Sequence, residues 1–148
     1  MATVGLDRQL CFALYSASRA MTAAYRPLLT ELNLTYPQYL VLLVLWEEGR
    51  VTVGRLGERL RLDSGTLSPL LKRLEANGFI SRERSASDER LVEVTLSPAG
   101  RRLERKAQCI PEQLGLSTGI SEREAADLRD AVHKLTDALN ASLRKESA

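Results

Sequence analysis

The sequence has few cysteines and no long hydrophobic run. Its 148 residues include two cysteines, which is too few for a disulfide scaffold, and a reducing compartment would keep them as thiols. No apolar stretch reaches the roughly 18 residues that a membrane-spanning helix needs. The N-terminal MATVGLDRQ lacks the basic and apolar regions of a signal peptide. We therefore expect a cytoplasmic protein without a membrane partner.

Histidine is even scarcer than cysteine, and the motifs of a redox enzyme are missing. His133 is the single histidine and has no cysteine nearby, which disfavours a metal site. No C-x-x-C motif occurs, and no set of threonine and arginine lies close around either cysteine, which argues against a thiol peroxidase. We expect no enzyme activity, no metal and no cofactor.

What is present is a core and an uneven charge. Hydrophobic residues make up 44% of the chain and charged residues 27%, which fits one compact domain, or a domain with dimerisation arms. From Arg50 to Lys106 there are 13 Lys/Arg and 8 Asp/Glu, a net charge of +5, and the remainder has 8 and 11, a net of −3. A basic middle favours a phosphate-bearing partner, although a solvated surface has the same signature.

The N-terminal half reads as helices. Asp7 is a candidate N-cap for a helix that begins near Arg8 and runs through RQLCFALYSASRAMTAAYRPLLTELN, with Pro27 bending or splitting it. Thr35 caps the next helix, TYPQYLVLLVLWEEG, which ends at Gly49. Because that segment is apolar nearly all round, it is predicted to be the central core helix.

The middle of the chain predicts a helix-turn-helix followed by a hairpin. Thr52 caps a short helix to about Leu60, and Asp63 or Ser64 caps a second that ends near Asn77. One buried stripe is expected on the second helix, from Leu67, Leu70, Leu71 and Leu74. FISRER and RLVEVTLS then alternate like strands around the polar turn SASDE. The fold class is therefore mainly α with a small β-hairpin wing.

The C-terminal part is predicted to serve dimerisation. Ser97 caps a helix, IPEQLGLSTG is read as a loop or short break, and SERE at Ser121 is a capping box that opens the terminal helix. Apolar residues recur along that helix at spacings of four and three, at Leu128, Val132, Leu135, Leu139 and Leu143. This spacing suits packing between subunits, and packing on the helix's own core is the alternative. We assign residues 1–34 and 110–148 to dimerisation and 35–109 to DNA binding.

Ten residues are candidate DNA contacts. They are Asp63, Ser64, Thr66, Ser68, Pro69, Lys72, Arg73, Arg84, Asp88 and Arg90. Small polar side chains at the start of the second helix let it approach base edges in the major groove, and the basic residues favour phosphate. An arginine at the wing tip can enter the minor groove, and Asp88 is close enough in sequence to hold Arg90 in place.

The helix-turn-helix and hairpin segment strongly resembles the MarR family of dimeric winged-helix repressors. The segment reads DSGTLSPLLKRLEANGFISRERSASDERLVEVTLSPAG and contains the wing signature D-x-R at Asp88 to Arg90. LCFALYSASRAMTAAYRPLL and LTYPQYLVLLVLWE are similar to the family's organic hydroperoxide resistance (OhrR-type) branch. The resemblance implies a homodimer on a pseudo-palindromic operator that leaves the DNA when an N-terminal cysteine, here Cys11, is oxidised by organic hydroperoxide. It also implies a thiolate pocket formed by Tyr25 and Tyr36, with Tyr15 as a third member.

The residues leave alternatives open for both cysteines. At the fourth helical position Cys11 can be a small hydrophobe that packs with Leu6 in a hydrophobic staple. The resemblance further implies two classes, one with a single sensing cysteine and one in which a second cysteine from the partner subunit resolves the oxidised thiol, and Cys109 either forms that disulfide with Cys11 or only packs. In the two-cysteine class the resemblance puts the resolving cysteine near Leu116, whereas Cys109 lies just before Ile110. The assignment to the one- or two-cysteine class therefore stays open. In the one-cysteine class the product is a mixed disulfide of Cys11 with a small thiol. The rival function is a MarR-type repressor released by a small phenolic or drug-like ligand.

Overall fold

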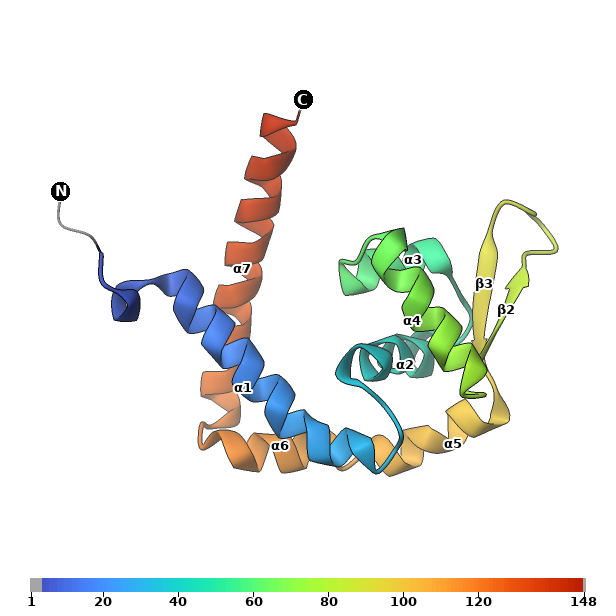
Figure 1. Cartoon of the computed structure of the whole chain (residues 1–148), viewed down its shortest axis with the longest axis horizontal. Coiled ribbons are helices and arrows are strands. Elements are labelled where there is room, and N and C mark those ends of the chain that lie inside the picture. Colours follow the sequence, from blue (N-terminus) through green and yellow to red (C-terminus); the bar gives the residue numbers. More distant parts are fainter. Residues whose placement is uncertain (1–3, 148) are drawn as a thin grey trace. The chain divides into compact units, whose positions relative to one another are not determined.

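The structure is a computed structural model that describes residues 4–147. Its elements are η1 (Leu6–Arg8), α1 (Leu10–Thr30), α2 (Tyr36–Glu48), β1 (Val51–Thr52), α3 (Val53–Leu60), α4 (Ser64–Ala76), β2 (Ile80–Arg84), β3 (Val92–Leu96), α5 (Pro98–Ala107), α6 (Ile110–Thr118) and α7 (Glu122–Glu146) (Figure 1). The chain forms two compact units, which divide after Ile110. No helix among the described residues is long and apolar enough to cross a membrane.

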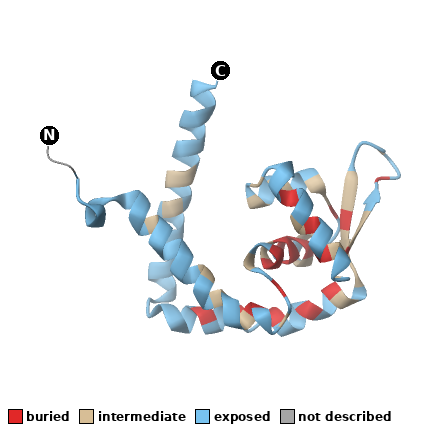
Figure 2. Ribbon diagram, viewed as in Figure 1, coloured by how far each residue is buried: buried red, intermediate tan, exposed pale blue. Residues whose placement is uncertain are grey.

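Helix α2 is the centre of the first unit's core, as the sequence predicts. The Thr35 hydroxyl accepts the Gln38 backbone N–H, and the Gln38 side chain accepts the Thr35 N–H at 2.9 Å, which completes a capping box. Val41, Leu42 and Leu45 are fully buried. Figure 2 shows the buried residues gathered on α2, α4, α5 and the sheet.

Helices α3 and α4 form the predicted helix-turn-helix. Thr52 caps α3, and Asp63 rather than Ser64 caps α4. The turn between them is tight, since a Cβ on Gly57 would lie 2.9 Å from the Leu62 carbonyl oxygen and Arg61 takes a left-handed φ of 56°. The predicted stripe on α4 is confirmed, with Leu70 only partly buried.

The wing is a sheet of three antiparallel strands in the order β1-β3-β2. The predicted hairpin pairs Ile80 with Leu96 and Arg84 with Val92. Strand β1 was not predicted. It has two residues, too few for a period-2 pattern to be visible, and it joins β3 just before α3 begins.

Two further local predictions were wrong, and a third was wrong in part. Asp7 lies in the short helix η1 and does not cap α1, whose N-cap Gln9 makes no side-chain cap bond. Pro27 does not split α1, which continues through it, and the bend predicted there stays a prediction. The segment read as a loop, IPEQLGLSTG, is mostly helix α6. Because α1 begins at Leu10, Cys11 is its second residue and not its fourth, so the predicted staple position does not apply.

The start of α5 is bonded to α2 and lies close against the hairpin. The Trp46 indole N–H donates to the Gly100 carbonyl at 3.0 Å, and Ser97 caps α5 through the Gly100 N–H. A Cβ on Gly100 would lie 2.1 Å from the carbonyl oxygen of Phe79. Helix α5 therefore begins directly against the end of the hairpin.

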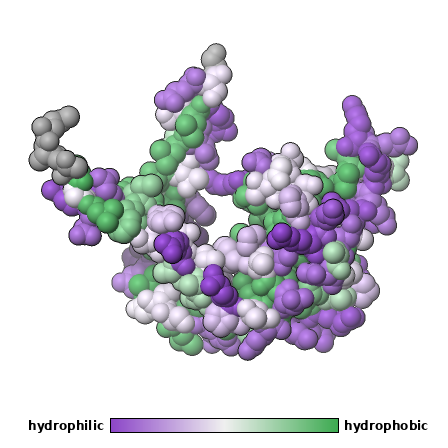
Figure 3. All heavy atoms as spheres, viewed as in Figure 1, coloured by the Kyte–Doolittle hydropathy of each residue, from purple (hydrophilic) through white to green (hydrophobic). Residues whose placement is uncertain are grey.

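The second unit consists mainly of α7, which opens at the predicted capping box. Ser121 accepts the Glu124 N–H, and the Glu124 carboxylate accepts the Ser121 N–H at 2.7 Å. No residue of α7 among those described is buried, and Leu128, Leu139 and Leu143 are more than half exposed. Apolar atoms line this helix in the space-filling view (Figure 3). Three of the residues predicted to pack between subunits are therefore exposed leucines.

Candidate functional site

The start of α4 presents small polar side chains to solvent. The Asp63 carboxylate accepts the Thr66 backbone N–H at 2.7 Å, and this bonding lowers the Asp63 pKa below its usual range. Ser64, Thr66 and Ser68 are exposed. The Asp63 side chain therefore caps α4 and orients its exposed first turn.

The rest of α4 has an exposed polar side opposite its leucines. Pro69, Lys72 and Arg73 are all exposed. Proline removes a backbone N–H from a helix, but α4 continues through Pro69 because the missing bond affects only the carbonyl of Gly65, in the first turn. The candidate residues of α4 therefore lie on its solvent side.

The tip of the wing is organised around Asp88. Its carboxylate accepts the Arg90 backbone N–H at 3.1 Å and two guanidinium N–H bonds at 3.1 and 3.2 Å. These bonds lower the Asp88 pKa, and the Arg90 side chain stays 89% exposed. Arg84 donates to the Glu89 carbonyl at 2.8 Å, across the loop. The structure thus confirms the contact predicted between Asp88 and Arg90, and it uses Arg84 to brace the loop.

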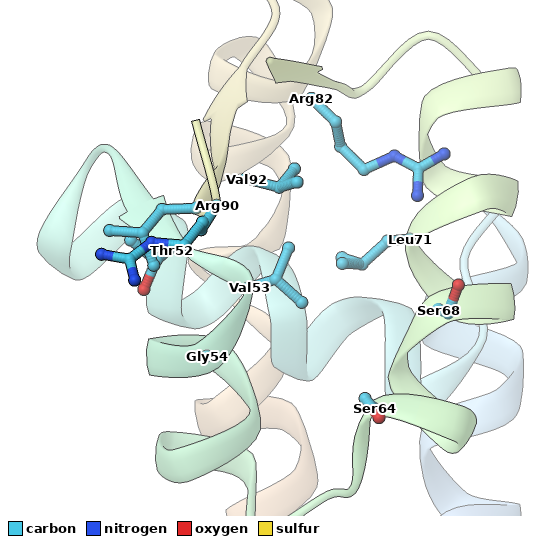
Figure 4. A pocket seen from close by; sticks show the side chains of 10 residues that line it. Thr52, Val53, Gly54, Ser64, Ser68, Leu71, Arg82, Arg90 and Val92 are labelled. Carbon is cyan, nitrogen blue, oxygen red and sulfur yellow. The ribbon is translucent and has the colours of Figure 1, made fainter. Parts of the chain in front are cut away.

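A cavity of about 370 Å³ separates α4 from the wing. Ser64, Ser68 and Leu71 line it from α4, and Arg82, Arg90 and Val92 line it from the wing (Figure 4). Ser64 and Ser68 of α4 and Arg90 of the wing, three of the candidate DNA contacts, therefore stand on opposite sides of one hollow.

Several arginines of the basic middle are engaged in ion pairs that the sequence did not reveal. On α3, Arg55 pairs with Glu48 at 3.1 Å and Arg59 with Glu47 at 2.8 Å, which ties α3 to the end of α2. The partners are seven and twelve residues apart, across a turn, so no helical spacing signals them. The net charge therefore overstates how many cations are free for phosphate.

Three tyrosines cluster at the junction of α1 and α2. The Tyr25 and Tyr36 rings are 4.7 Å apart between centroids, and Tyr39 lies 5.9 and 6.5 Å from them. Burial raises the pKa of Tyr25 to about 12, with smaller contributions from the other two rings, and burial also raises the pKa values of Tyr36 and Tyr39. The three phenols are therefore protonated donors at neutral pH. Tyr39, read from the sequence as core, is indeed buried.

The third tyrosine expected in this pocket, Tyr15, lies four residues after Cys11 in α1, on the same side of that helix as the thiol. Tyr15 is 59% exposed, and the Arg19 guanidinium stands over its ring at 5.6 Å from the centroid. None of the ring contacts found among residues 4–147 joins Tyr15 to the cluster of Tyr25 and Tyr36.

The two cysteines are both free and exposed. Cys11 lies in the first turn of α1, and Tyr25 follows fourteen residues later in the same helix. At a rise of 1.5 Å per residue they are about 21 Å apart along the axis, too far for a hydrogen bond. Cys109 lies between α5 and α6, with its thiol 3.7 Å from the Lys106 carbonyl oxygen. One chain alone therefore does not bring Cys11 and Tyr25 together.

The geometry up to this point defines a winged helix-turn-helix protein of the kind that binds double-stranded DNA. A family description for the transcriptional regulators SarA and Rot matches residues 23–107. The regulator TtmR of Methylorubrum extorquens strain PA1 is 52% identical over 136 residues, 92% of this chain and 70% of its own. The organic hydroperoxide resistance transcriptional regulator of Bacillus subtilis strain 168 is 49% identical over 138 residues, 91% and 92% of the two chains.

Solved structures agree with this grouping. Reduced AbfR bound to DNA has a TM-score of 0.77 at 36% identity, over 93% of this chain and 94% of its own. AbfR is a protein of Staphylococcus epidermidis. PcaV of Streptomyces coelicolor, solved with its natural ligand, has a TM-score of 0.84 at 25% identity, over 94% and 99%. The chain belongs to the OhrR-type branch of the MarR family of transcriptional regulators, and it is not an enzyme.

Proposed function

We propose that this protein is a homodimeric repressor that leaves its operator when organic hydroperoxide oxidises Cys11. The observation that carries the proposal is the placement of that thiol, exposed in the first turn of a long helix. An exposed thiol is accessible to peroxide, and the thiolate is the nucleophile in cysteine oxidation. The names of the Bacillus and Staphylococcus relatives support the same reading.

The DNA-binding part of the proposal rests on α4 and the wing. The exposed hydroxyls of Ser64, Thr66 and Ser68 face base edges in the major groove, and Lys72 and Arg73 neutralise phosphate. Arg90, held by Asp88 at the tip of the wing, enters the adjacent minor groove. Two copies related by a two-fold axis then read a pseudo-palindromic operator.

Dimerisation supplies the pocket that one chain lacks. Cys11, Ser18 and Tyr25 recur at seven-residue spacing, so they share one face of α1. If two α1 helices cross antiparallel near Ser18, Cys11 of each copy approaches Tyr25 of the other. Tyr36 stacks on Tyr25 and completes the pocket. The uncovered leucines of α7 supply further apolar surface for the same dimer.

The oxidation itself is a two-electron step. The Cys11 thiolate attacks one peroxide oxygen, an S–O bond forms as the O–O bond breaks, and the alkoxide leaves and takes up a proton to become an alcohol. The product is a sulfenic acid. Hydrogen bonds from Tyr25 and Tyr36 of the second copy favour the thiolate, because bonds to charged groups are the stronger ones. The exposed Leu10 and Phe12 beside the thiol favour organic peroxides over hydrogen peroxide.

The second step condenses the sulfenic acid with a thiol and releases water. The thiol is either Cys109 of the second copy or a small cellular thiol, and both routes give a disulfide at Cys11. Exposure of Cys109 leaves it accessible for the first route. The mixed disulfide displaces the tyrosines from the thiol, and the intersubunit disulfide pulls helices together. In either case the two wings lose the half-site spacing of about 34 Å or a multiple of it.

A second candidate function is release by a small phenolic ligand. The observation that favours it is a cavity of about 360 Å³ between α1 and α2, lined by Arg26, Tyr36 and neighbouring residues. An arginine beside apolar walls suits an aromatic acid. In this case Cys11→Ser keeps its response to the ligand, whereas the peroxide sensor loses its response to peroxide.

The deciding experiment treats the reduced protein with one equivalent of an organic hydroperoxide. Mass spectrometry, a non-reducing gel and DNA binding are compared for wild type, Cys11→Ser and Cys109→Ser. A reducible dimer that needs both cysteines supports the two-cysteine route, and an adduct on Cys11 alone supports the small-thiol route. An unreacted Cys11 contradicts the sensor and favours the ligand-responsive repressor.

A further inference from the structure

The recognition helix and the wing are joined by one charged side-chain pair. Glu75 lies in the last turn of α4, and Arg82 lies in β2. The Glu75 carboxylate accepts the backbone N–H of Arg82 at 2.9 Å with one oxygen and its guanidinium at 3.1 Å with the other. The bonds from Arg82 also lower the Glu75 pKa, so the pair is charged at neutral pH. Together they form a two-point attachment between the two elements.

This attachment lies beside a hollow between α4 and the wing. Towards the DNA-facing side, the 370 Å³ cavity separates Ser64 and Ser68 on α4 from Arg90 on the wing. Figure 4 shows the Arg82 side chain reaching from β2 towards α4 beside Leu71. A hollow therefore lies between the two DNA-directed surfaces, whereas the base of the hairpin is packed into the core through Ile80 and Val94. The pair of Glu75 and Arg82 is a side-chain link between α4 and β2 just beyond that packed base.

One hydrogen-bond donor of the Arg82 side chain lacks a partner within residues 4–147. Its Nε–H is buried and has no acceptor among the described residues. A buried donor without a partner is destabilising, and a native structure that keeps one needs a reason for it. A role in placing the wing gives that reason, because the planar guanidinium fixes direction as well as charge.

We propose that Glu75 and Arg82 are positioning residues that set the distance between the recognition helix and the wing, and so determine specificity at the minor-groove positions of the operator. The proposal rests on the DNA contacts proposed above. Neither side chain needs to touch a base. They act through Arg90, whose reach into the minor groove depends on where the hairpin stands relative to α4.

The test measures base discrimination at two places in one duplex. A duplex is enriched from a randomised pool with the wild-type dimer, and footprinting locates its central major-groove bases and its flanking wing contacts. Affinity is then measured after A·T to G·C changes at the flanks and after base changes at the centre. Glu75→Gln and Arg82→Lys are compared with Glu83→Gln, which removes one exposed carboxylate from the same strand as Arg82.

We expect Glu75→Gln to lower discrimination at the flanks by about fivefold or more and to keep it at the centre. Arg82→Lys retains the charge and the backbone donor, so its discrimination at the flanks should lie between those of wild type and Glu75→Gln. Glu83→Gln should match wild type. Unchanged flanking discrimination in Glu75→Gln overturns the proposal, as does an equal loss at flank and centre. If wild type itself shows no preference at the flanks, the proposed wing contact has failed, and the positioning role fails with it.

Discussion

Cys11 and Tyr25 share one face of α1 and are about 21 Å apart along it, one in the first turn and the other next to Tyr36 near the opposite end. A thiol and its hydrogen-bond donors at this separation serve one site only if a second copy of the chain brings them together. In the proposed sensor, a change at the thiol would therefore act directly on the dimer interface that spaces the two wings.

The tyrosine cluster makes stability fall at high pH. The folded-state pKa of Tyr25 is about 12, above its ordinary value of 10.0, chiefly because of burial. Between these values the unfolded chain loses the phenolic proton first, so the free energy of unfolding decreases as pH rises from 10 to 12. Urea unfolding across this range should show a shallower decline for Tyr25→Phe than for wild type. Equal slopes would show that Tyr25 is not buried as described.

Gly100 is the tightest point between α5 and the hairpin. Gly100→Ala places a methyl group 2.1 Å from the Phe79 carbonyl oxygen, so the backbone must shift. We expect Gly100→Ala to lower the free energy of unfolding by about 1–3 kcal/mol. Gly54→Ala is the matched control, since its Cβ would meet only Thr52 Oγ1, at 3.9 Å, and it should be neutral or slightly stabilising. Equal effects of the two substitutions would contradict the close approach.

The wing tip should contribute both charge and orientation. Arg90→Ala removes the minor-groove contact and is expected to weaken operator binding by about 1–3 kcal/mol and to reduce its salt dependence. Asp88→Asn keeps the arginine but weakens its two guanidinium bonds, so binding should fall by less. Arg105→Ala, on an exposed position of α5, is the control for lost charge. Titration at several salt concentrations measures all three, and a loss for Arg105→Ala as large as for Arg90→Ala would remove the wing from the interface.

Much of the fold could be predicted because its boundaries depend on short-range chemistry. Thr35, Thr52, Asp63, Ser97 and Ser121 all cap the helices that the sequence assigned to them. A cap needs only a side-chain oxygen and the N–H two or three residues ahead, so local sequence is sufficient. The pairing of Asp88 with Arg90 was predictable for the same reason, since the two lie within one turn of the wing.

The errors arose where structure depends on distant partners or on weak signals. Strand β1 exists because β3 pairs with it, and α6 is helical although its sequence contains Pro111 and Gly115. The link between Glu75 and Arg82 joins two elements through a turn, with no periodic spacing to reveal it. For the sensor, sequence named the tyrosines through a family resemblance, but only the helix length shows that Cys11 cannot reach them within one chain.

The most direct test of the shared pocket uses mixed dimers, purified with two different tags. One pairs a Cys11→Ser chain with a Tyr25→Phe chain. The other pairs a chain carrying both substitutions with a wild-type chain. Each has one Cys11, so the rate of its oxidation by an organic hydroperoxide can be compared directly.

If the pocket forms between copies, the first mixed dimer keeps one complete site, with Cys11 and Tyr25 both intact, and it reacts at the wild-type rate per thiol. The second reacts about tenfold more slowly or worse, because its remaining Cys11 faces a phenylalanine and loses a hydrogen bond to the thiolate. The opposite order of rates would place Cys11 and Tyr25 of one chain in the same site and contradict the shared pocket. Equal rates would remove Tyr25 from the sensor.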